Sequence, residues 1–539
     1  MKRIVSLLLI FAMLFSLSSC AKIKKILGRG AKQVFSYPID QMPETLDPQI
    51  ASSAAELTII ENCMEGLVRV NAEGKAVPAV AESWKVSADG LKYTFNLRRD
   101  AAWYIDDSFE YPIDAGFDKT IKAGDFVYAI SRAVKKSTKA PDFQSVSLIK
   151  NAVKIHDSGS NDTSSLGVKA IDDYTLQITL ETPNSAFILS LASAVFMPCD
   201  KEFFDSCSGR YGRQLKYFIS NAGFYLKNWV EKSLTISKNE EYKGSNPSKG
   251  ESVTLYYDEN ATENFKNDNY DAIPVSGDYI GEAIADENIT VQKYDDTVWS
   301  IAVNCKSTFG SSARFRQALM QCVKSDELTF PDWTSDAQGI VPNICTLGNE
   351  NYRTVAKHAK YLPYNTSDAT KKYFGALSSL FKDEAAEKGS LVKVYTIAAF
   401  EETAKQIVQM WQRNLGTGFQ AKINAVSFEE LEEAVENGSY DIAVYPFSAD
   451  TQDSLVFLNK FKTKDNVLNF NSAAFNKILS SKMNELKKAK TAENVLLSTG
   501  AVMPLVTSNS YYAQRKNISG IYFYAFGGKV NFLGAVRSE

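Results

Sequence analysis

The sequence predicts an α/β fold in the C-terminal half of the chain and an α+β arrangement nearer the N-terminus. Between residues 391 and 447, strand-like and helix-like patterns alternate, which is typical of βαβ units and a largely parallel sheet. Between residues 35 and 190, short segments alternate apolar and polar residues, as half-buried strands do. A chain of 539 residues is also too long for one ordinary core, so two or three domains are expected.

Start and stop signals bound the C-terminal elements. Gly416 ends one predicted helix, and a second helix is expected between Ser427 and Gly438. Glu430 follows Ser427 by three residues and completes a capping box. The predicted elements, in order, are strand 391–397, helix 401–415, strand 419–423, the helix that starts at Ser427, and strand 440–447.

The N-terminal region predicts fewer regular elements. Residues 91–97 and 176–180 alternate as strands, and residues 121–134 place apolar side chains at helical spacing. An aromatic and acidic loop, residues 104–120, precedes that helix.

The first residues have the parts of an export signal. Lys2 and Arg3 precede an apolar run, residues 4–17, and small residues then lead to Cys20. The run is about 14 residues, shorter than the roughly 20 that a membrane-spanning helix needs. The residues before Cys20 resemble the lipobox of bacterial lipoproteins, which implies acylation of Cys20 and attachment to a bacterial membrane. Residues 20–32 would then be a flexible spacer. The alternative is an ordinary cleaved signal in which this cysteine is incidental.

Composition excludes several classes of protein. A formal net charge of −3 argues against a nucleic-acid-binding protein, and a mean hydropathy of −0.21 excludes a polytopic membrane protein. Of the seven cysteines, none forms a Cys-x-x-Cys pair, so neither structural zinc nor a redox motif is expected. Export permits disulfides, but their pairing cannot be read from the sequence.

No motif argues for an enzyme. The chain has two histidines, His156 and His358, and both lie in polar segments that favour exposed positions. The G-x-S-x-G, H-E-x-x-H and glycine-rich phosphate-binding patterns are absent from the sequence. We therefore expect no catalytic residue, no metal site and no cofactor.

One carboxylate has a position that favours ligand binding. Asp450 follows the predicted strand 440–447, and ligands of open α/β sheets lie outside the carboxyl ends of the strands. There it would suit a cationic group such as a peptide α-amine. The alternative is helix capping, because Leu455 and Leu458 predict a helix just after this Asp, which is a favoured N-cap residue. Position alone leaves both interpretations open.

Short segments spread along the chain resemble one family. They are residues 45–48 (TLDP), 65–67 (EGL), 78–84 (PAVAESW), 89–95 (DGLKYTF), 125–128 (DFVY), 221–225 (NAGFY) and 314–319 (RFRQAL). Each segment is a weak signal alone. Their order and spacing together make nearly the whole mature chain similar to the oligopeptide-binding proteins of ABC importers, extracellular solute-binding family 5.

The resemblance implies a two-lobed periplasmic-binding-protein fold with an extra small α+β domain, of the cluster C type. Lobe one would comprise residues 33–65, 191–296 and 509–539. The small domain would comprise residues 66–190, and lobe two residues 297–508.

The resemblance also implies a function. The chain would be a monomeric receptor that binds a peptide between its lobes as an added strand and delivers it to ABC permease subunits. The alternative is a signalling or adhesion lipoprotein of the same fold that binds peptide or protein without transport.

Several site residues follow from the same resemblance. Residues 447–450 (FSAD) match a family motif in which the Asp meets the amino terminus of the peptide, so Asp450 becomes a predicted ligand contact. Phe447 is a predicted pocket wall, with a core position as its alternative, and Tyr128 is a weaker pocket candidate. Ser52, Ala54 and Ser448 are the predicted positions for pairing with the ligand backbone.

The chain also departs from the family pattern. Thr451 stands where the family commonly has Tyr, and Val435 and Val444 stand where some oligopeptide binders carry Arg. Residues 506–508 replace a usual Tyr run, and the loop 104–120 is unusual. These departures leave the identity of the ligand open.

Overall fold

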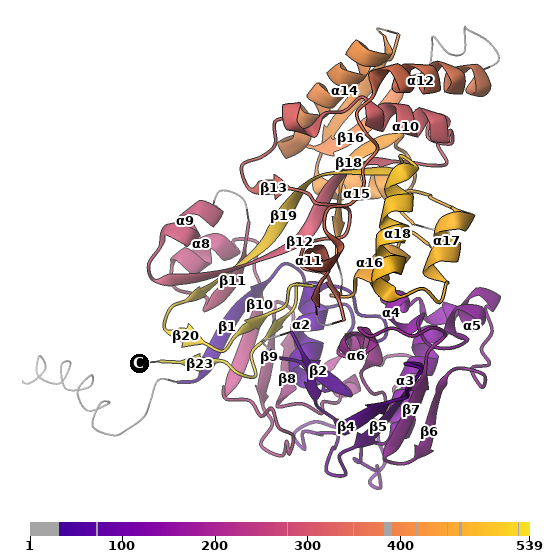
Figure 1. Ribbon diagram of the computed structural model, residues 1–539. Helices are drawn as coiled ribbons and strands as arrows, with labels where there is room; N and C mark the ends of the chain where they lie inside the picture. Colours follow the sequence, from indigo (N-terminus) through magenta and orange to yellow (C-terminus); the bar gives the residue numbers. More distant parts are fainter. Residues whose placement is uncertain are drawn as a thin grey trace, which may run out of the picture.

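In the computed structural model, the described residues are 32–71, 74–276, 279–348, 350–381, 391–416, 418–449, 451–462, 466–526 and 528–538. Cys20 and Asp450, two residues with predicted roles, lie outside these ranges. Figure 1 shows an upper body joined to a broader lower body by long strands. Among the described residues, no helix combines the length and apolar character needed to cross a bilayer.

The two long strands that join the bodies belong to one mixed sheet. Its order is β11-β19-β12-β18-β16-β17, with β13 added to β19. The strands are β11 (Ala272–Val275), β12 (Ile289–Val303), β13 (Thr334–Asp336), β16 (Val392–Ile397), β17 (Ala421–Val426), β18 (Ile442–Ser448) and β19 (Val502–Arg515).

The pairing of β12 with β19 changes register where the lobes meet. The ladder runs from Ile289 opposite Arg515 to Ala302 opposite Val502, with a shift between Asp295 and Thr297. On one side of this shift β19 pairs with β11, and on the other side β12 pairs with β18. The predicted domain boundaries, 296/297 and 508/509, fall at this shift. They stay predictions.

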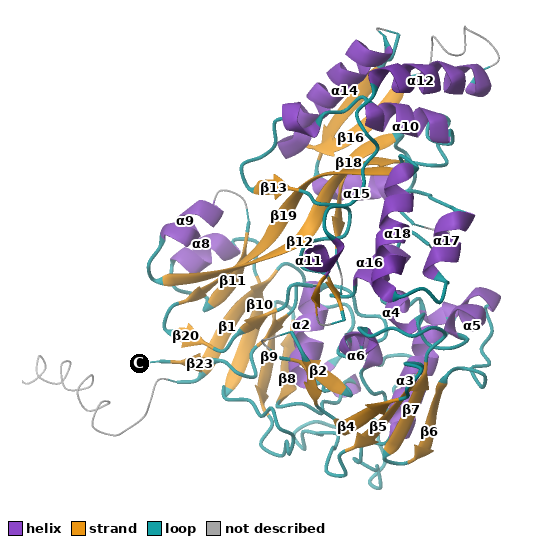
Figure 2. Cartoon of the chain, viewed as in Figure 1, coloured by secondary structure: helices purple, strands orange, loops and turns teal. Residues whose placement is uncertain are grey.

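Lobe two has helices on both faces of the sheet (Figure 2). Because side chains alternate along a strand, Val298 and Trp299 of β12 belong to different buried clusters. The cluster around Trp299 includes α10 (Ala313–Gln321), α12 (Thr366–Leu380) and α14 (Glu401–Leu415). The cluster around Val298 includes α11 (Tyr352–Ala356), α16 (Ser454–Asn459), α17 (Ala473–Leu479) and α18 (Glu485–Ser498).

The expected elements of lobe two are confirmed, but the expected sheet is not. The predicted helix 401–415 is α14, and Ser427 caps α15 (Phe428–Glu436) through the predicted capping box. The three predicted strands are parallel, since β16 pairs with β17 and β18, but a largely parallel sheet is wrong, because the other pairings described in this sheet are antiparallel. The long strands β12 and β19 join the sheet antiparallel from distant parts of the chain.

The lower body contains two further sheets. Lobe one has the order β1-β10-β9-β8, and the small domain has the order β4-β5-β7-β6. The strands are β1 (Val34–Ile39), β4 (Ala81–Val86), β5 (Lys92–Leu97), β6 (Val168–Asp172), β7 (Thr175–Thr179), β8 (Phe224–Val230), β9 (Ser233–Lys238) and β10 (Ser252–Tyr257). The predicted strands 91–97 and 176–180 are thus confirmed as β5 and β7.

Helices and short strands complete the lower body and its junction with lobe two. The helices are α2 (Ala54–Cys63), α3 (Ala123–Val134), α4 (Phe143–Val146), α5 (Ala152–Ser158), α6 (Phe187–Ser190), α7 (Lys201–Ser206), α8 (Ala261–Lys266) and α9 (Tyr279–Ala285). The short strands are β2 (Val68–Val70), β3 (Ala76–Pro78), β14 (Thr346–Leu347), β15 (Glu350–Asn351), β20 (Ile518–Ser519), β21 (Tyr522–Phe523), β22 (Val530–Asn531) and β23 (Val536–Arg537). The predicted helix 121–134 is confirmed as α3.

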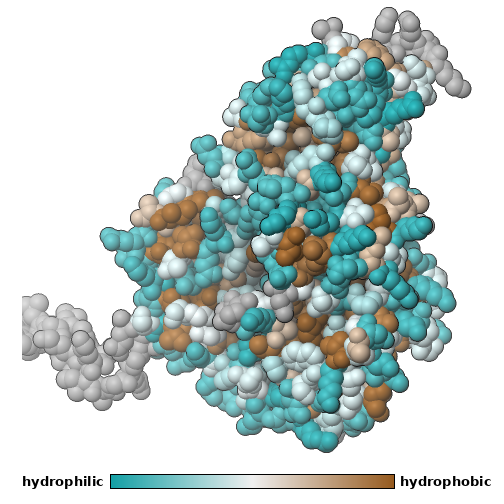
Figure 3. All heavy atoms as spheres, in the orientation of Figure 1, coloured by the Kyte–Doolittle hydropathy of each residue, from teal (hydrophilic) through white to brown (hydrophobic). Residues whose placement is uncertain are grey.

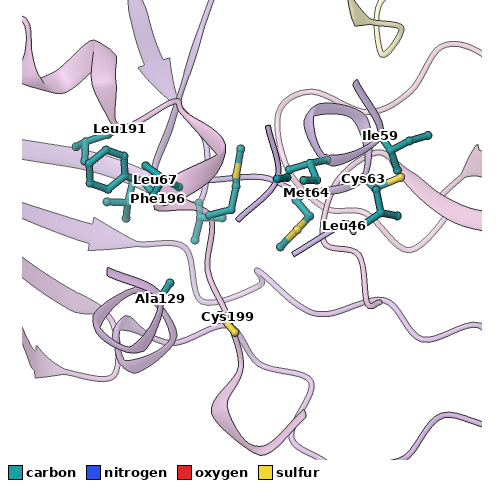
Figure 4. Close-up of a cluster of buried hydrophobic side chains, with 14 of the residues drawn as sticks. Leu46, Ile59, Cys63, Met64, Leu67, Ala129, Leu191, Phe196 and Cys199 are labelled. Carbon is teal, nitrogen blue, oxygen red and sulfur yellow. The ribbon is translucent and has the colours of Figure 1, made fainter. Parts of the chain in front are cut away.

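Lobe one and the small domain share one buried hydrophobic cluster. It contains Ile59 and Cys63 of α2, Ala129 of α3, and Leu191 and Phe196 between α6 and α7 in the sequence (Figure 4). Because the apolar surface of α2 and α3 is buried in the same cluster, burial holds lobe one and the small domain together.

Five cysteines among the described residues are free thiols. They are Cys63, Cys199, Cys207, Cys305 and Cys322.

A buried ion pair holds residues 340–341 and the helix α11 against α18 in lobe two. Glu493 on α18 is 2% exposed and pairs with Arg353 of α11. The Glu493 carboxylate also accepts hydrogen bonds from the backbone N–H of Ile340 (2.9 Å) and Val341 (3.2 Å) and from the hydroxyl of Tyr352 (2.9 Å). Removing one partner would leave the guanidinium buried without its counter-charge.

We therefore expect Glu493→Gln to lower the free energy of unfolding by about 3–5 kcal/mol. Urea denaturation followed by circular dichroism measures this change. The matched control is Glu401→Gln, which removes the exposed Glu401–Lys405 pair and is expected to leave the denaturation midpoint unchanged. Equal effects of the two substitutions would contradict the structural role of Glu493.

Candidate ligand-binding site

A cavity of about 270 Å³ lies where lobe one, the small domain and lobe two meet. Most of its lining residues come from five segments of the chain, 48–52, 141–144, 189–195, 451–460 and 522–529, and Leu57 and Val70 complete the wall. Figure 3 shows hydrophobic side chains gathered near the middle of one face, where the upper and lower bodies meet. A concave, largely apolar site between domains is the usual form of a ligand pocket.

Glu56 of α2 holds the lobe-one wall of this cavity. Its carboxylate accepts the backbone N–H groups of Thr45 (3.1 Å), Ser52 (2.9 Å) and Ser53 (3.1 Å). Ser53 in turn caps α2 through a capping box, and Ala54 is the first residue of the helix. Ser52 lines the cavity. The N–H of Ser52 is already engaged, because it donates to Glu56.

Asp453 holds the lobe-two wall. Its side chain caps α16 by accepting the backbone N–H groups of Leu455 (2.7 Å) and Val456 (3.3 Å). The expected alternative role of Asp450, capping this helix, is therefore wrong, because the N-cap is Asp453. Asp450 itself lies outside the described residues, whereas Thr451, the next residue in sequence, lines the cavity.

Hydrogen bonds join the small domain to lobe two at and near Asp453, a cavity residue. Asn184 of the small domain donates to the Asp453 carboxylate at 2.8 Å. Ser185 donates to the Glu485 carboxylate through its N–H (2.7 Å) and its hydroxyl (2.5 Å). Burial raises the pKa of Asp453, while the hydrogen bonds from Asn184 and the helix N–H groups oppose this rise. These contacts join the small domain to lobe two, and in the described part of the chain no buried hydrophobic cluster includes both.

Phe447 and Ser448 lie at the end of β18. Phe447 is 7% exposed and packs on Phe461, with ring centroids 5.5 Å apart. Ser448 is exposed, and its hydroxyl lies 2.8 Å from that of Thr297. Its carbonyl oxygen accepts a hydrogen bond from Lys460, a cavity residue, at 2.9 Å. Ser448 thus contacts a cavity residue but does not itself line the cavity, whereas Phe447 packs within the core of lobe two.

Tyr128 lies apart from the other predicted contacts. It sits on α3, and its ring packs edge-on against Phe204 with centroids 5.7 Å apart. It lines a separate hollow together with Arg132 and Val168 of the small domain. The structure therefore does not bring Tyr128 to the cavity that Ser52 lines.

The residues that depart from the family pattern lie in different places. Val435 and Val444 are 2% and 1% exposed, so both face the protein interior rather than a ligand. Val506, Thr507 and Ser508 are also buried, within β19. Of these departures, Thr451 is a cavity residue.

The expectation for the histidines is half right. His358 is exposed, as expected. His156 is half-buried, because its ring stacks on Phe143 at 3.9 Å between centroids and its Nδ1 lies 3.1 Å from the carbonyl oxygen of Val134. The packing of α5 against α3 and α4 covers this ring, which the polar sequence around His156 does not reveal.

Two hydroxyls in the cavity wall are unpaired. Among the described residues, the side-chain oxygens of Ser190 and Thr451 are buried and have no hydrogen-bond partner. Buried polar groups in native proteins are nearly all hydrogen-bonded, so such groups in a pocket wall are suited to a polar ligand.

The C-terminal wall of the cavity was not predicted from the sequence. Tyr522, Tyr524 and Phe526 line it from the hairpin of β21 and β22. The alternating aromatic residues from Tyr522 onward were an available signal. Nothing local shows that this hairpin lies beside residues 48–52.

Comparison with known proteins identifies the family. The sequence profile of the bacterial extracellular solute-binding proteins, family 5, matches residues 75–469. The chain is 34% identical to the oligopeptide-binding protein SarA of Streptococcus gordonii over 220 residues, which are 40% of this chain and 31% of SarA. The match thus spans only about a third of SarA. The chain is 22% identical to the oligopeptide-binding protein OppA of Bacillus subtilis over 96% of both chains.

A solved structure confirms the fold. Listeria monocytogenes OppA bound to peptide superposes with a TM-score of 0.73 at 24% identity, covering 94% of this chain and 100% of that one. The expected two-lobed α/β fold is therefore correct. Since the family profile matches more than half of its length, the chain belongs to the bacterial extracellular solute-binding proteins of family 5.

Proposed function

We propose that this chain is a lipid-anchored receptor that captures peptides in the cavity between its lobes and delivers them to ABC permease subunits. The chain acts as a monomer and has no enzymatic activity. The observation that carries the proposal is the cavity itself, which has walls from both lobes and contains the unpaired hydroxyls of Ser190 and Thr451. The names of SarA and OppA, which are oligopeptide-binding proteins, support peptide as the ligand class.

The geometry of the walls suits an extended peptide. Ser52 lies on the lobe-one side, and Ser52, Ser448 and Ala54 are proposed as pairing positions. A peptide bound as an added strand gains affinity from its main-chain hydrogen bonds, which do not depend on its sequence. Phe447 and Tyr128 stay predicted contacts, although Phe447 packs within lobe two and Tyr128 borders another hollow.

The proposed tether is Cys20, with residues 20–32 as the spacer. Several acyl chains on one residue give stable anchoring, because each buried methylene contributes about 0.8 kcal/mol. Mass spectrometry of the detergent-extracted protein tests this part, and a mature N-terminus without acyl mass at Cys20 would contradict it.

Native mass spectrometry of the purified chain tests the ligand class. The expected result is a set of co-purifying peptides, released on denaturation, with one peptide bound per chain. A bound sugar or metal chelate in place of peptides would contradict the proposal. Cleaved products after incubation with a peptide library would instead indicate a hydrolase.

Asp450 is proposed to pair with the amino terminus of the peptide. Its neighbour Thr451 lines the cavity, and the capping role near it belongs to Asp453. Breaking a buried charge pair costs about 2–5 kcal/mol. Asp450→Asn is therefore expected to weaken peptides with a free amino terminus by roughly 30-fold or more, and N-acetylated peptides far less.

Isothermal titration calorimetry with one peptide in both forms measures this difference. Asp326→Asn, an exposed Asp in lobe two, is the matched control and should leave both affinities unchanged. Equal weakening of the free and acetylated peptides by Asp450→Asn would remove this residue from the site.

A further inference from the structure

A second cavity of about 200 Å³ adjoins the first, with walls from lobe one and from residues 66–71 at the start of the small domain. Val70, Ala192, Tyr522 and Tyr524 line both cavities, so the two spaces share a wall. The charged residues of the second cavity are Glu61, Glu65 and Arg69.

The carboxylate of Glu61 is fully engaged. It accepts hydrogen bonds from the hydroxyl of Tyr524 and from Nδ2 of Asn531 (3.4 Å), and it pairs with Nζ of Lys529 at 2.7 Å. Both members of the pair are largely buried, at 9% and 14% side-chain exposure. The negative charge of Glu61 is therefore balanced within the protein.

The carboxylate of Glu65 is engaged in the same way. One oxygen accepts from Nη2 of Arg98 at 3.0 Å, and the other accepts from the hydroxyl of Tyr242 at 2.6 Å. Burial raises the pKa of Glu65, and the bonds and charges around it, including the charge of Arg69, oppose that rise. Glu65 thus adds no uncompensated negative charge to the cavity.

Arg69, unlike Glu61 and Glu65, has no partner of opposite charge among the described residues. It lies in β2 opposite Val77 and is half-buried. Its Nε is buried and has no hydrogen-bond partner among the described residues. The described carboxylates also form no salt bridge with Arg69, since Glu65 pairs with Arg98 and Glu61 pairs with Lys529. With Glu61 and Glu65 each paired to another cation, the cavity keeps one positive charge.

We propose that the second cavity is an extension of the ligand site in which Arg69 binds a carboxylate of the ligand. A guanidinium presents donors in a planar fork that matches a carboxylate, and such charge-assisted bonds are the strongest in proteins. The shared wall places this group beside the main cavity. The inference rests on the proposed function and adds a preference among peptides: the carboxylate is either an acidic side chain or the carboxyl terminus.

The test uses alanine-based hexapeptides with one Glu at each position in turn, and the same series with Gln. Each peptide is made with a free or an amidated carboxyl terminus, and affinities are measured by isothermal titration calorimetry. The native protein is expected to favour a carboxylate over its amide by roughly tenfold or more, either at one Glu position or at the carboxyl terminus. The arm that shows the preference identifies the source of the carboxylate.

Arg69→Gln is expected to abolish this preference and to leave the affinity for the neutral peptides within about twofold. Arg69→Lys keeps the charge and should retain part of the preference. Arg99→Gln, an exposed arginine of the small domain, is the matched control and should retain all of it. Thermal unfolding of each variant verifies that it is folded.

Two results would overturn the inference. One is a native protein that binds every Glu and Gln pair, and every acid and amide pair, with equal affinity, a measurement that needs no variant. The other is a folded Arg69→Gln protein that keeps the preference. Failure of every peptide to bind would instead reject the proposed function, and the inference with it.

Discussion

The pairing of β12 with β19 is the constraint on which the rest of the structure depends. These strands run through both lobes, and their ladder is continuous except at register shifts, one of them between Asp295 and Thr297. A shift of this kind leaves an extra residue on one strand and bends it locally. Asp296 occupies this place, and its buried carboxylate accepts a hydrogen bond from Ser510 at 2.6 Å. A hydrogen bond between the two strands therefore stabilises the register shift where the lobes meet.

The two strands connect the lobes and so determine which surfaces of the lobes face each other across the cavity. Lobe one contributes the loop held by Glu56, and lobe two contributes the segment capped by Asp453. Among the described residues, the large cluster shared by lobe one and the small domain contains none between 297 and 508. The contacts across the cavity include hydrogen bonds such as Asn184 to Asp453 and the packing of the Phe526 ring against the hydrophobic cluster of lobe two. Closure of two bodies around a ligand needs contacts that form and break without unfolding either core, and polar contacts of this kind meet that need.

Local patterns in the sequence predicted local elements well. The boundaries of α14 and the capping box of Ser427 follow from helix periodicity and capping chemistry, which act within a few residues. The antiparallel addition of β12 and β19 did not follow, because strand pairing between residues about 200 apart leaves no local trace. The role of Tyr522 and Tyr524 as cavity residues was not predicted for the same reason, because their hairpin is far in sequence from the other cavity residues. The interpretation of Asp450 as the helix cap failed because α16 begins later, after Asp453, and helix ends are the least predictable part of a helix.

We propose that peptide binds between the lobes. A crystal structure of the chain with the peptide that co-purifies with it tests this claim most directly. We expect an extended peptide in the cavity, in contact with Ser52 on one side and with residues 451–460 on the other. A peptide bound elsewhere on the surface, with this cavity left unchanged, would contradict it.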